Sequence, residues 1–379
     1  MAITLDTAPY IISPAYNGVD WVLDSNTADL LSLRVDVYFD GVYESTIDVP
    51  PRLGTTDKFD VRVGSIAKRM LSPMLDTVAA VGSFSITDAP EAHTGVQIKV
   101  FEVYLLAGVI TTAWNETQTG TPDYTSTTPQ AVRMALNGVE ALSDYSVTGV
   151  NQARLLTMRP LNSFVYQDQP LQLDFVSELN SLEFRVIEID SSGGTLNDTT
   201  TATYDNSSKY RGRFFIDVAG LDADTAKFTV VMRFSGVDRS QTYTFNVVRG
   251  ICTHKVLYWD NHIGGYDCHY FDAGLSATTK SNASQMIPVS TGLRTNISGV
   301  QDEEISVFSS MHSNDMFRMI AESSLNRAEA YEFDVKTRVF RPIIIQPSSG
   351  TKKYRDTRKH VNELKVSYVY AKRSQSLRG

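Results

Sequence analysis

Two-residue alternation of apolar and polar side chains runs through much of this 379-residue chain and limits what it can fold into. Successive side chains of a strand point to opposite faces, so this pattern places one face on a core and the other outward. Clusters of Gly, Asn, Asp and Ser separate the runs, which is typical of β-sandwiches. The clearest runs are Leu33, Val35, Val37 and Phe39; Phe101, Val103 and Leu105; Phe228, Val230, Met232 and Phe234; Tyr243, Phe245 and Val247; and Leu364, Val366, Tyr368 and Tyr370.

The pattern divides the chain into four segments. We expect residues 1–112 and 131–250 to form two β-sandwiches. Residues 113–130 contain six threonines and two prolines and have no periodicity, which predicts a long loop, or an arm that lies on a neighbouring subunit. Residues 251–379 change character and predict a small α+β domain.

One helix is expected in that last segment, over residues 309–330. Its apolar residues recur at steps of four, four and three, which places them on one helix face. The predicted fold class is therefore mainly β, with one or two N-terminal β-sandwich domains followed by a small α+β domain with one amphipathic helix. The residues on the helix face are Phe317, Ala321, Leu325 and Ala328.

Two stretches of the chain resemble each other. KFDVRVGSI at 58–66 aligns with RFFIDVAGL at 213–221. A second similar pair lies upstream, with LRV at 33–35 before the first segment and FRV at 184–186 before the second. The echo indicates a duplicated sandwich whose loops differ in length. Chance similarity between strands is the competing interpretation.

Charge is unevenly distributed along the chain. The net charge is −8, but residues 351–379 carry nine Lys/Arg and two Asp/Glu against 26 and 41 in the rest. A basic tail on an acidic body favours self-association or docking on an acidic partner, or it is a lysine-rich edge strand that blocks aggregation. The acidic total argues against nucleic acid as a partner.

No membrane or export signal is expected. No apolar run reaches the ~18 residues that a membrane helix needs, and MAITLDTAPY lacks the basic start and apolar core of a signal peptide. We therefore expect a protein that is not exported by the usual route and does not bind a membrane.

Residues 257–271, LYWDNHIGGYDCHYF, are compatible with a metal site, a sugar-binding surface or a packed β-hairpin. Zinc takes Cys and His ligands, but adjacent residues of a strand point to opposite faces, so Cys268 and His269 cannot both join one site. We therefore expect no metal and no cofactor. The candidate metal ligands are Cys252, His254, His262, Cys268 and His269.

The aromatic residues of this stretch have two interpretations. They stack on sugars, together with Trp114, or they become cross-strand pairs if 257–262 and 266–271 pair around Gly264-Gly265. The hairpin is the favoured interpretation. The aromatic residues concerned are Tyr258, Trp259, Tyr266, Tyr270 and Phe271.

Motifs of common enzymes are absent from the sequence. There is no G-x-S-x-G, no H-E-x-x-H, no P-loop and no dinucleotide fingerprint. The aspartates of 217–224 lack the spacing of an EF-hand calcium loop. We expect a protein that is not an enzyme.

The same stretch resembles a signature, L-x-W-x-N-x-x-G-G-x-D-x-x-x-F, of virion structural proteins of tailed bacteriophages that infect Bacteroidota. The likeness is specific over about 255–379, and it departs from the family at His262, where Arg or Lys is frequent. Weaker similarities are a Val37-Tyr38-x-x-Gly41 strand, a segment Pro342–Ile345, a lysine-bearing loop and a closing strand Leu364–Tyr370. The signature residues here are Leu257, Trp259, Asn261, Gly264, Gly265, Asp267 and Phe271.

The resemblance implies a non-enzymatic virion subunit, a ring-forming component of the tail tip or neck that is assembled in the host cytoplasm. Its implied partners are copies of itself, six or twelve in a ring, and other virion proteins. The signature hairpin would order the assembly domain, and a basic loop would dock on a neighbour. The alternative is a carbohydrate-binding or adhesion module. The docking residues expected are Lys352, Lys353, Arg355, Arg358 and Lys359.

Overall fold

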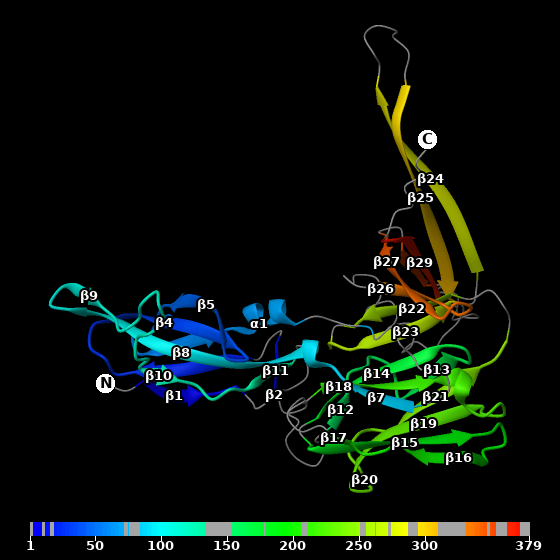
Figure 1. Ribbon diagram of the computed structural model, residues 1–379, viewed down its shortest axis with the longest axis horizontal. Coiled ribbons are helices and arrows are strands. Elements are labelled where there is room, and N and C mark those ends of the chain that lie inside the picture. The colour runs from blue at the N-terminus through cyan, green and yellow to red at the C-terminus, as the bar shows by residue number, and fades with distance from the viewer. Residues whose placement is uncertain are drawn as a thin grey trace.

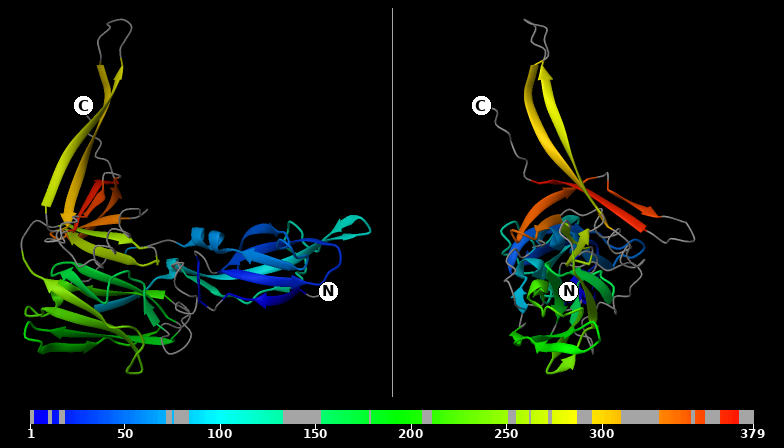
Figure 2. Two further views of the ribbon diagram at one scale, coloured as in Figure 1. Left: turned by 180° about the vertical axis from the view of Figure 1, so that it is seen from behind. Right: turned by 90° about the vertical axis from the view of Figure 1, so that its right-hand side faces the viewer.

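The chain is mainly β and builds an elongated body from which one hairpin projects (Figure 1). The N-terminal sandwich lies at one end of the long axis and the second sandwich at the other, with the C-terminal sheet beside the second (Figures 1 and 2). The structure, a computed structural model, describes residues 3–9, 12–15, 19–71, 75, 84–132, 153–177, 179–205, 211–250, 255–261, 263–271, 274–286, 295–309, 330–346, 349–353 and 362–371.

The first sandwich packs a three-stranded sheet, β1-β3-β6, on a sheet of order β2-β11-β8-β4-β5, with β9 and β10 also paired to β8. Alternate residues of these strands fill one core, centred on Trp21, Val35 and Ile98. The strands are β1 (Ile3–Thr7), β2 (Ile12–Pro14), β3 (Asp20–Ser25), β4 (Leu30–Phe39), β5 (Val42–Val49), β6 (Lys58–Arg62), β8 (His93–Leu106), β9 (Val109–Thr111), β10 (Tyr124–Thr125) and β11 (Gln130–Val132).

The second sandwich pairs a sheet β12-β14-β18-β7 with a sheet β13-β21-β19-β15-β16, to which β17 and β20 are added. Its core includes a stacked pair, Phe184 and Phe214, with ring centroids 4.0 Å apart. The strands are β7 (Phe84–Asp88), β12 (Ala153–Leu155), β13 (Asn162–Tyr166), β14 (Pro170–Ser177), β15 (Ser181–Ile189), β16 (Thr195–Thr200), β17 (Tyr204–Asp205), β18 (Arg211–Asp217), β19 (Lys227–Phe234), β20 (Val237–Asp238) and β21 (Tyr243–Val248).

The larger sheets of the two sandwiches share one strand order. In the first, β2 is parallel to β11, and β11, β8, β4 and β5 follow in antiparallel order; β13, β21, β19, β15 and β16 repeat this pattern. Equivalent arginines even make equivalent ion pairs. Arg34 of LRV bonds Asp48 with Nε–Oδ1 at 2.8 Å, and Arg185 of FRV bonds Asp198 at the same distance.

Strand β7 departs from the division into segments. It belongs to residues 1–112, yet it forms the edge of the second sandwich, with Phe84–Asp88 antiparallel to Gly212–Ile216 of β18. The short 3-10 helix η1 (Pro90–Ala92) then leads back into β8 of the first sandwich. The pairing joins residues far apart in sequence, which is why local pattern does not reveal it. It links the two sandwiches through shared backbone hydrogen bonds.

Residues 113–130 lie on their own sandwich. Strands β10 and β11 pair with β8, and Trp114 donates its indole Nε1–H to Asp36 Oδ1 at 2.9 Å. The side chain of Arg34 covers the indole ring at 4.4 Å from its centroid. The expected arm on a neighbouring subunit is therefore a packed part of the first domain.

The C-terminal sheet has the order β23-β22-β26-β27-β29-β25-β24, with β28 paired to β29. Its longest pair, β24 and β25, projects from the body as a hairpin (Figure 1). The strands are β22 (Lys255–Asp260), β23 (Tyr266–Phe271), β24 (Gly274–Met286), β25 (Thr295–Ser309), β26 (Ala330–Asp334), β27 (Val339–Ile345), β28 (Gly350–Lys353) and β29 (Asn362–Tyr370).

The helix expected over 309–330 falls almost wholly outside the described residues; Ser309 ends β25 and Ala330 begins β26. A helix that the sequence did not predict, α1 (Gly64–Met70), follows β6 and buries Ala67 against the first core. The 3-10 helix η2 (Val218–Gly220) follows β18 at the equivalent place in the second sandwich.

Candidate functional site

The signature stretch forms the hairpin β22–β23, in which Lys255–Asp260 pairs with Tyr266–Phe271. Its turn closes through three bonds. Asn261 N–H donates to Gly265 O, Gly264 N–H donates to Asn261 O, and Gly265 N–H donates to Asn261 Oδ1, at 2.8, 3.1 and 2.9 Å. The predicted pairing around Gly264-Gly265 is confirmed.

The two faces of this hairpin belong to two different cores. Leu257, Trp259 and Phe271 pack with strands of the C-terminal sheet, whereas Tyr258 and Cys268 belong to the core of the second sandwich. Because side chains alternate along a strand, this one hairpin contributes one face to the core of the second sandwich and the other face to the core of the C-terminal sheet. The signature residues on its apolar positions face the C-terminal domain.

The two glycines of the turn serve different purposes. Gly264 has a φ of 101°, which side chains other than glycine rarely adopt. Gly265 lies against the segment that follows β12, where an added Cβ would be 2.0 Å from Leu156 O. The first glycine makes the turn, and the second allows the close approach of the two domains.

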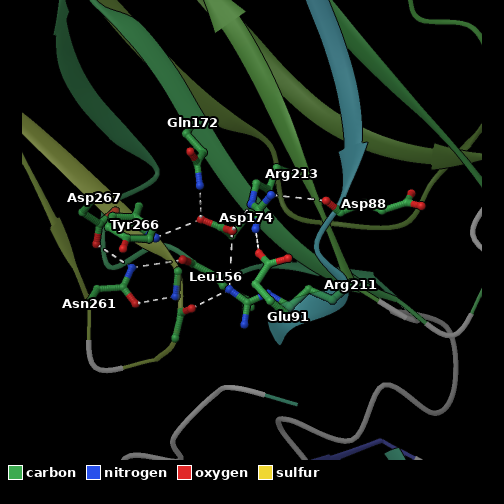
Figure 3. Close-up of polar contacts among 12 residues, drawn as sticks. Asp88, Glu91, Leu156, Gln172, Asp174, Arg211, Arg213, Asn261, Tyr266 and Asp267 are labelled. Carbon is green, nitrogen blue, oxygen red and sulfur yellow. Dashed lines mark hydrogen bonds and ion pairs between the residues drawn. The ribbon is translucent and has the colours of Figure 1, made fainter. Parts of the chain in front are cut away.

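Asn261 and Asp267 bind the hairpin to the second sandwich (Figure 3). The Asn261 amide donates to Leu156 O at 3.0 Å and to Asp267 Oδ2 at 2.9 Å. Asp267 also accepts from the Thr157 hydroxyl and from the Met158 N–H. Both side chains are almost fully buried, and their bonds cross between segments about a hundred residues apart.

A buried ion pair lies directly below the turn. Asp174 accepts from Tyr266 N–H and from the Gln172 amide, at 2.9 and 3.0 Å. Arg211 lies 3.4 Å from Asp174 Oδ1 and donates to Gly264 O (Figure 3). Burial raises the pKa of the Asp174 carboxyl, and the positive charge of Arg211 opposes that shift.

The same network reaches the first half of the chain. Arg213, opposite Asp174 in the β14–β18 register, pairs with Glu91 of η1 and donates to Asp88 O at 3.3 Å. Polar contacts therefore connect β7 and η1, the second sandwich and the signature hairpin (Figure 3). The sequence analysis did not find Asp174, Arg211 or Arg213; two arginines at i and i+2 on an apolar strand were the available signal.

Substituting Asp267 tests this network. Asp267→Asn places an N–H₂ donor among groups that already donate, so we expect a loss of about 2–3 kcal/mol in the free energy of unfolding. The matched control is Asp198→Asn, which removes an exposed ion pair and costs less than about 1 kcal/mol. Urea denaturation measures both, and equal losses would contradict a structural role for Asp267.

The structure separates the candidate metal ligands. Cys268 belongs to the core of the second sandwich, where Arg159 donates to it at 3.0 Å, and its neighbour His269 contacts the Ser309 hydroxyl at 3.1 Å. Burial raises the pKa of the Cys268 thiol, which disfavours the thiolate that binds metals. Over the described part of the chain, no three His, Cys, Asp or Glu side chains gather into a metal site. The other three candidate ligands, Cys252, His254 and His262, lie outside the described residues.

The carbohydrate interpretation required exposed aromatic rings, and the hairpin has none. Trp259 is 1% exposed, and each of the other four aromatic residues of the hairpin is buried in one or the other of the two cores. Trp114 is half-buried under Arg34. The stacking-platform hypothesis for the aromatics of 257–271 is therefore wrong, because the hairpin lies between two cores that bury both of its faces. The buried neighbours are Tyr258, Tyr266, Tyr270 and Phe271.

The basic docking residues are only partly placed. Lys352 and Lys353 lie on β28, opposite Glu363 and Asn362 of β29. Arg355, Arg358 and Lys359 lie outside the described residues. Their docking role stays a prediction.

Comparison with known proteins identifies no family. No protein-family model matches the chain, and no curated protein matches its sequence. A chain from the tail of an empty GTA particle with C6 symmetry is similar at 12% identity and a TM-score of 0.22, over 32% of this chain and 94% of that chain. A titin fragment, A168169, is similar at 8% identity and a TM-score of 0.26, over 66% of this chain and 100% of that chain. No helix among the described residues has the length and apolar character to cross a membrane.

Proposed function

We propose that this chain is a non-enzymatic structural subunit of a tailed-phage virion, which assembles with copies of itself into a ring of the tail or neck. The observation that carries the proposal is the hairpin β24–β25. Gly274–Met286 pairs with Thr295–Phe308, but β29 reaches only Ile305–Ser309 of β25. Along Thr295–Glu304 of β25, the described part of the chain supplies no strand other than β24 as a pairing partner.

Such a hairpin needs contacts that the described part of its own chain does not supply. An isolated two-stranded hairpin in water is at best marginally stable. Its first strand, GLSATTKSNASQM, consists mainly of Ser, Thr, Ala and Asn, so it supplies little apolar area of its own. Its unpaired edges offer backbone donors and acceptors to another chain. These features suit an element that is stabilised by neighbouring subunits in an assembly.

Charge supports the same proposal. Strand β25 carries Asp302, Glu303 and Glu304 in succession near the base of the hairpin. Strand β28, on the other side of β29, carries Lys352 and Lys353. Opposite charges on separate strands of this sheet suit contacts between neighbours, where complementary potentials set the register.

The interdomain network fits a subunit that transmits force rather than one that turns over a substrate. Titratable groups at the signature hairpin, among them Asp267 and the pair Asp174–Arg211, are buried and hydrogen-bonded within the chain. These hydrogen bonds join the hairpin to the second sandwich.

The experiment shortens the hairpin and measures assembly. Residues 279–303 are replaced by Asn-Gly, which joins the cross-strand partners Thr278 and Glu304 through a two-residue turn. We expect wild-type protein to form closed rings by light scattering and negative stain. The shortened variant should keep its melting temperature and remain a monomer.

A matched control enlarges an exposed turn elsewhere. Gly193, between β15 and β16, has open space around it, so two extra glycines there should leave both folding and assembly unchanged. Rings that form equally well without the hairpin would refute the proposed role. A shortened variant that unfolds would show that the hairpin belongs to the core of the subunit instead.

A further inference from the structure

The two sandwiches, which share a strand order, differ sharply at one equivalent hairpin. In the first, β8 and β9 are joined by Ala107-Gly108; in the second, β19 and β20 are joined by Ser235-Gly236. Both central residues of each turn have positive φ, at 53° and 82° in the first turn and 50° and 77° in the second. The two turns have the same backbone, so any difference between them lies in the side chains.

The flanking side chains of the first turn are aliphatic and exposed. Leu106 and Val109 face each other in the register, followed by Leu105 and Ile110. Leu106, Val109 and Ile110 are 60%, 66% and 65% exposed. We call these four residues the apolar tip.

The second turn shows that the backbone does not require this chemistry. The position of the Leu105–Ile110 pair is taken by Arg233 and Asp238, which form an ion pair of 3.0 Å. The ring of Phe234 is accompanied by Arg239, whose guanidinium lies 5.9 Å from its centroid. The second turn thus has one apolar pair, Phe234 and Val237, followed by an ion pair, whereas the first presents two successive aliphatic pairs to water.

Contiguous exposed aliphatic residues at a free end indicate a contact surface, whereas single ones are ordinary. The apolar tip lies at the far end of the first sandwich (Figure 1). No charged residue occurs from Val103 to Asn115, so the surface lacks the charges that would keep it solvated.

Two exposed apolar side chains lie close together in sequence on the other sandwich. Leu161 and Phe164, at and beside β13, are exposed, and the stretch LNSFVY carries no charge. Strand β13 lies in the sandwich at the opposite end of the long axis from β9 (Figures 1 and 2). Two apolar groups at opposite ends of one subunit are suited to a head-to-tail contact.

We propose that the apolar tip of one subunit docks against Leu161 and Phe164 of a second copy of this chain. The inference rests on the proposed function and names the contact surface within it. A standard interface buries about 800 Å² on each partner, so a four-residue tip is an anchor within a larger interface. A head-to-tail contact repeats by rotation, which gives a closed ring or a filament.

Charge insertion at the tip is the first test. Val109→Asp should raise the dissociation constant of self-association at least about tenfold, because a carboxylate would have to be buried in an apolar contact. The matched control is Val237→Asp, at the equivalent position of the second turn, which is 52% exposed. It should leave self-association unchanged, as sedimentation equilibrium measures.

Mixed disulfides identify the occupant. In a Cys252→Ser background, with Cys268 buried, Val109→Cys protein is mixed with Phe164→Cys protein and oxidised. A covalent dimer that forms in the mixture and in neither protein alone is the expected result. The absence of this dimer, or equal weakening by the two aspartate variants, overturns the inference.

Two further outcomes separate this inference from its rivals. Loss of binding to phosphatidylglycerol vesicles in Val109→Asp, with self-association unchanged, would assign the tip to a membrane and overturn docking between copies. Normal rings in Val109→Asp, together with monomers after hairpin shortening, would overturn this inference and leave the proposed function standing.

Discussion

Gly265→Ala is expected to lower the free energy of unfolding by more than about 3 kcal/mol. The added Cβ would lie 2.0 Å from Leu156 O and 3.1 Å from Leu156 C, and both are backbone atoms. Neither a rotamer change nor a small shift relieves an overlap with backbone. The turn would have to move away from Leu156, which breaks the bonds of Asn261 and Asp267 across the junction.

The readout has to be specific to the junction, because a multidomain chain need not unfold in one step. We expect limited proteolysis to cut Gly265→Ala between the second sandwich and the C-terminal sheet at a urea concentration that leaves the wild type intact. The control is Gly193→Ala, which adds a Cβ at a φ of 91° in open space and costs only the backbone strain of about 1–2 kcal/mol. Equal stability of the two variants would mean that the two domains do not approach closely at Gly265.

Trp259→Ala is expected to lower the free energy of unfolding by about 3–5 kcal/mol. Trp259 is 1% exposed and packs with Leu257 and Phe271 in the core of the C-terminal sheet. Truncation leaves a large cavity in the core that Trp259 shares with Leu257 and Phe271. Urea denaturation followed by far-ultraviolet circular dichroism should show the C-terminal domain unfolding first.

A control separates this core role from ligand binding. Trp114→Ala removes a half-buried ring that makes one hydrogen bond to Asp36, and it should cost less than Trp259→Ala. Glycan binding by the wild type that disappears in a fully folded Trp259→Ala protein would contradict the buried role and revive the adhesion hypothesis.

The interdomain hairpin and the projecting hairpin belong to one sheet, which is relevant to the assembly proposed above. Tyr258 anchors β22 to the core of the second sandwich, and Cys268 anchors β23 to the same core. From β22 the sheet continues through β26, β27 and β29 to β25. Contacts made by β24 and β25 would therefore act on a sheet that the buried polar network holds in place. Loosening that network in Asp267→Asn or Gly265→Ala should weaken assembly as well as stability.

The sequence by itself determined the local properties of this protein. Alternation is a property of neighbouring residues, so it revealed the β class and most strands. The echo of LRV and FRV left duplication and chance similarity open, and the repeated strand order became visible only in the sheets. The pairing around Gly264-Gly265 was also predictable, because a two-stranded hairpin closes over a few residues.

Only the tertiary structure decided what those elements meet. The pairing of β7 with β18, the ion pair of Asp174 with Arg211 and the approach of Gly265 to Leu156 all join segments far apart along the chain. Periodicity contains no information on such distant partners. The same holds for Trp259, whose type suits a sugar platform or a core equally well until the two domains that enclose its hairpin are in place.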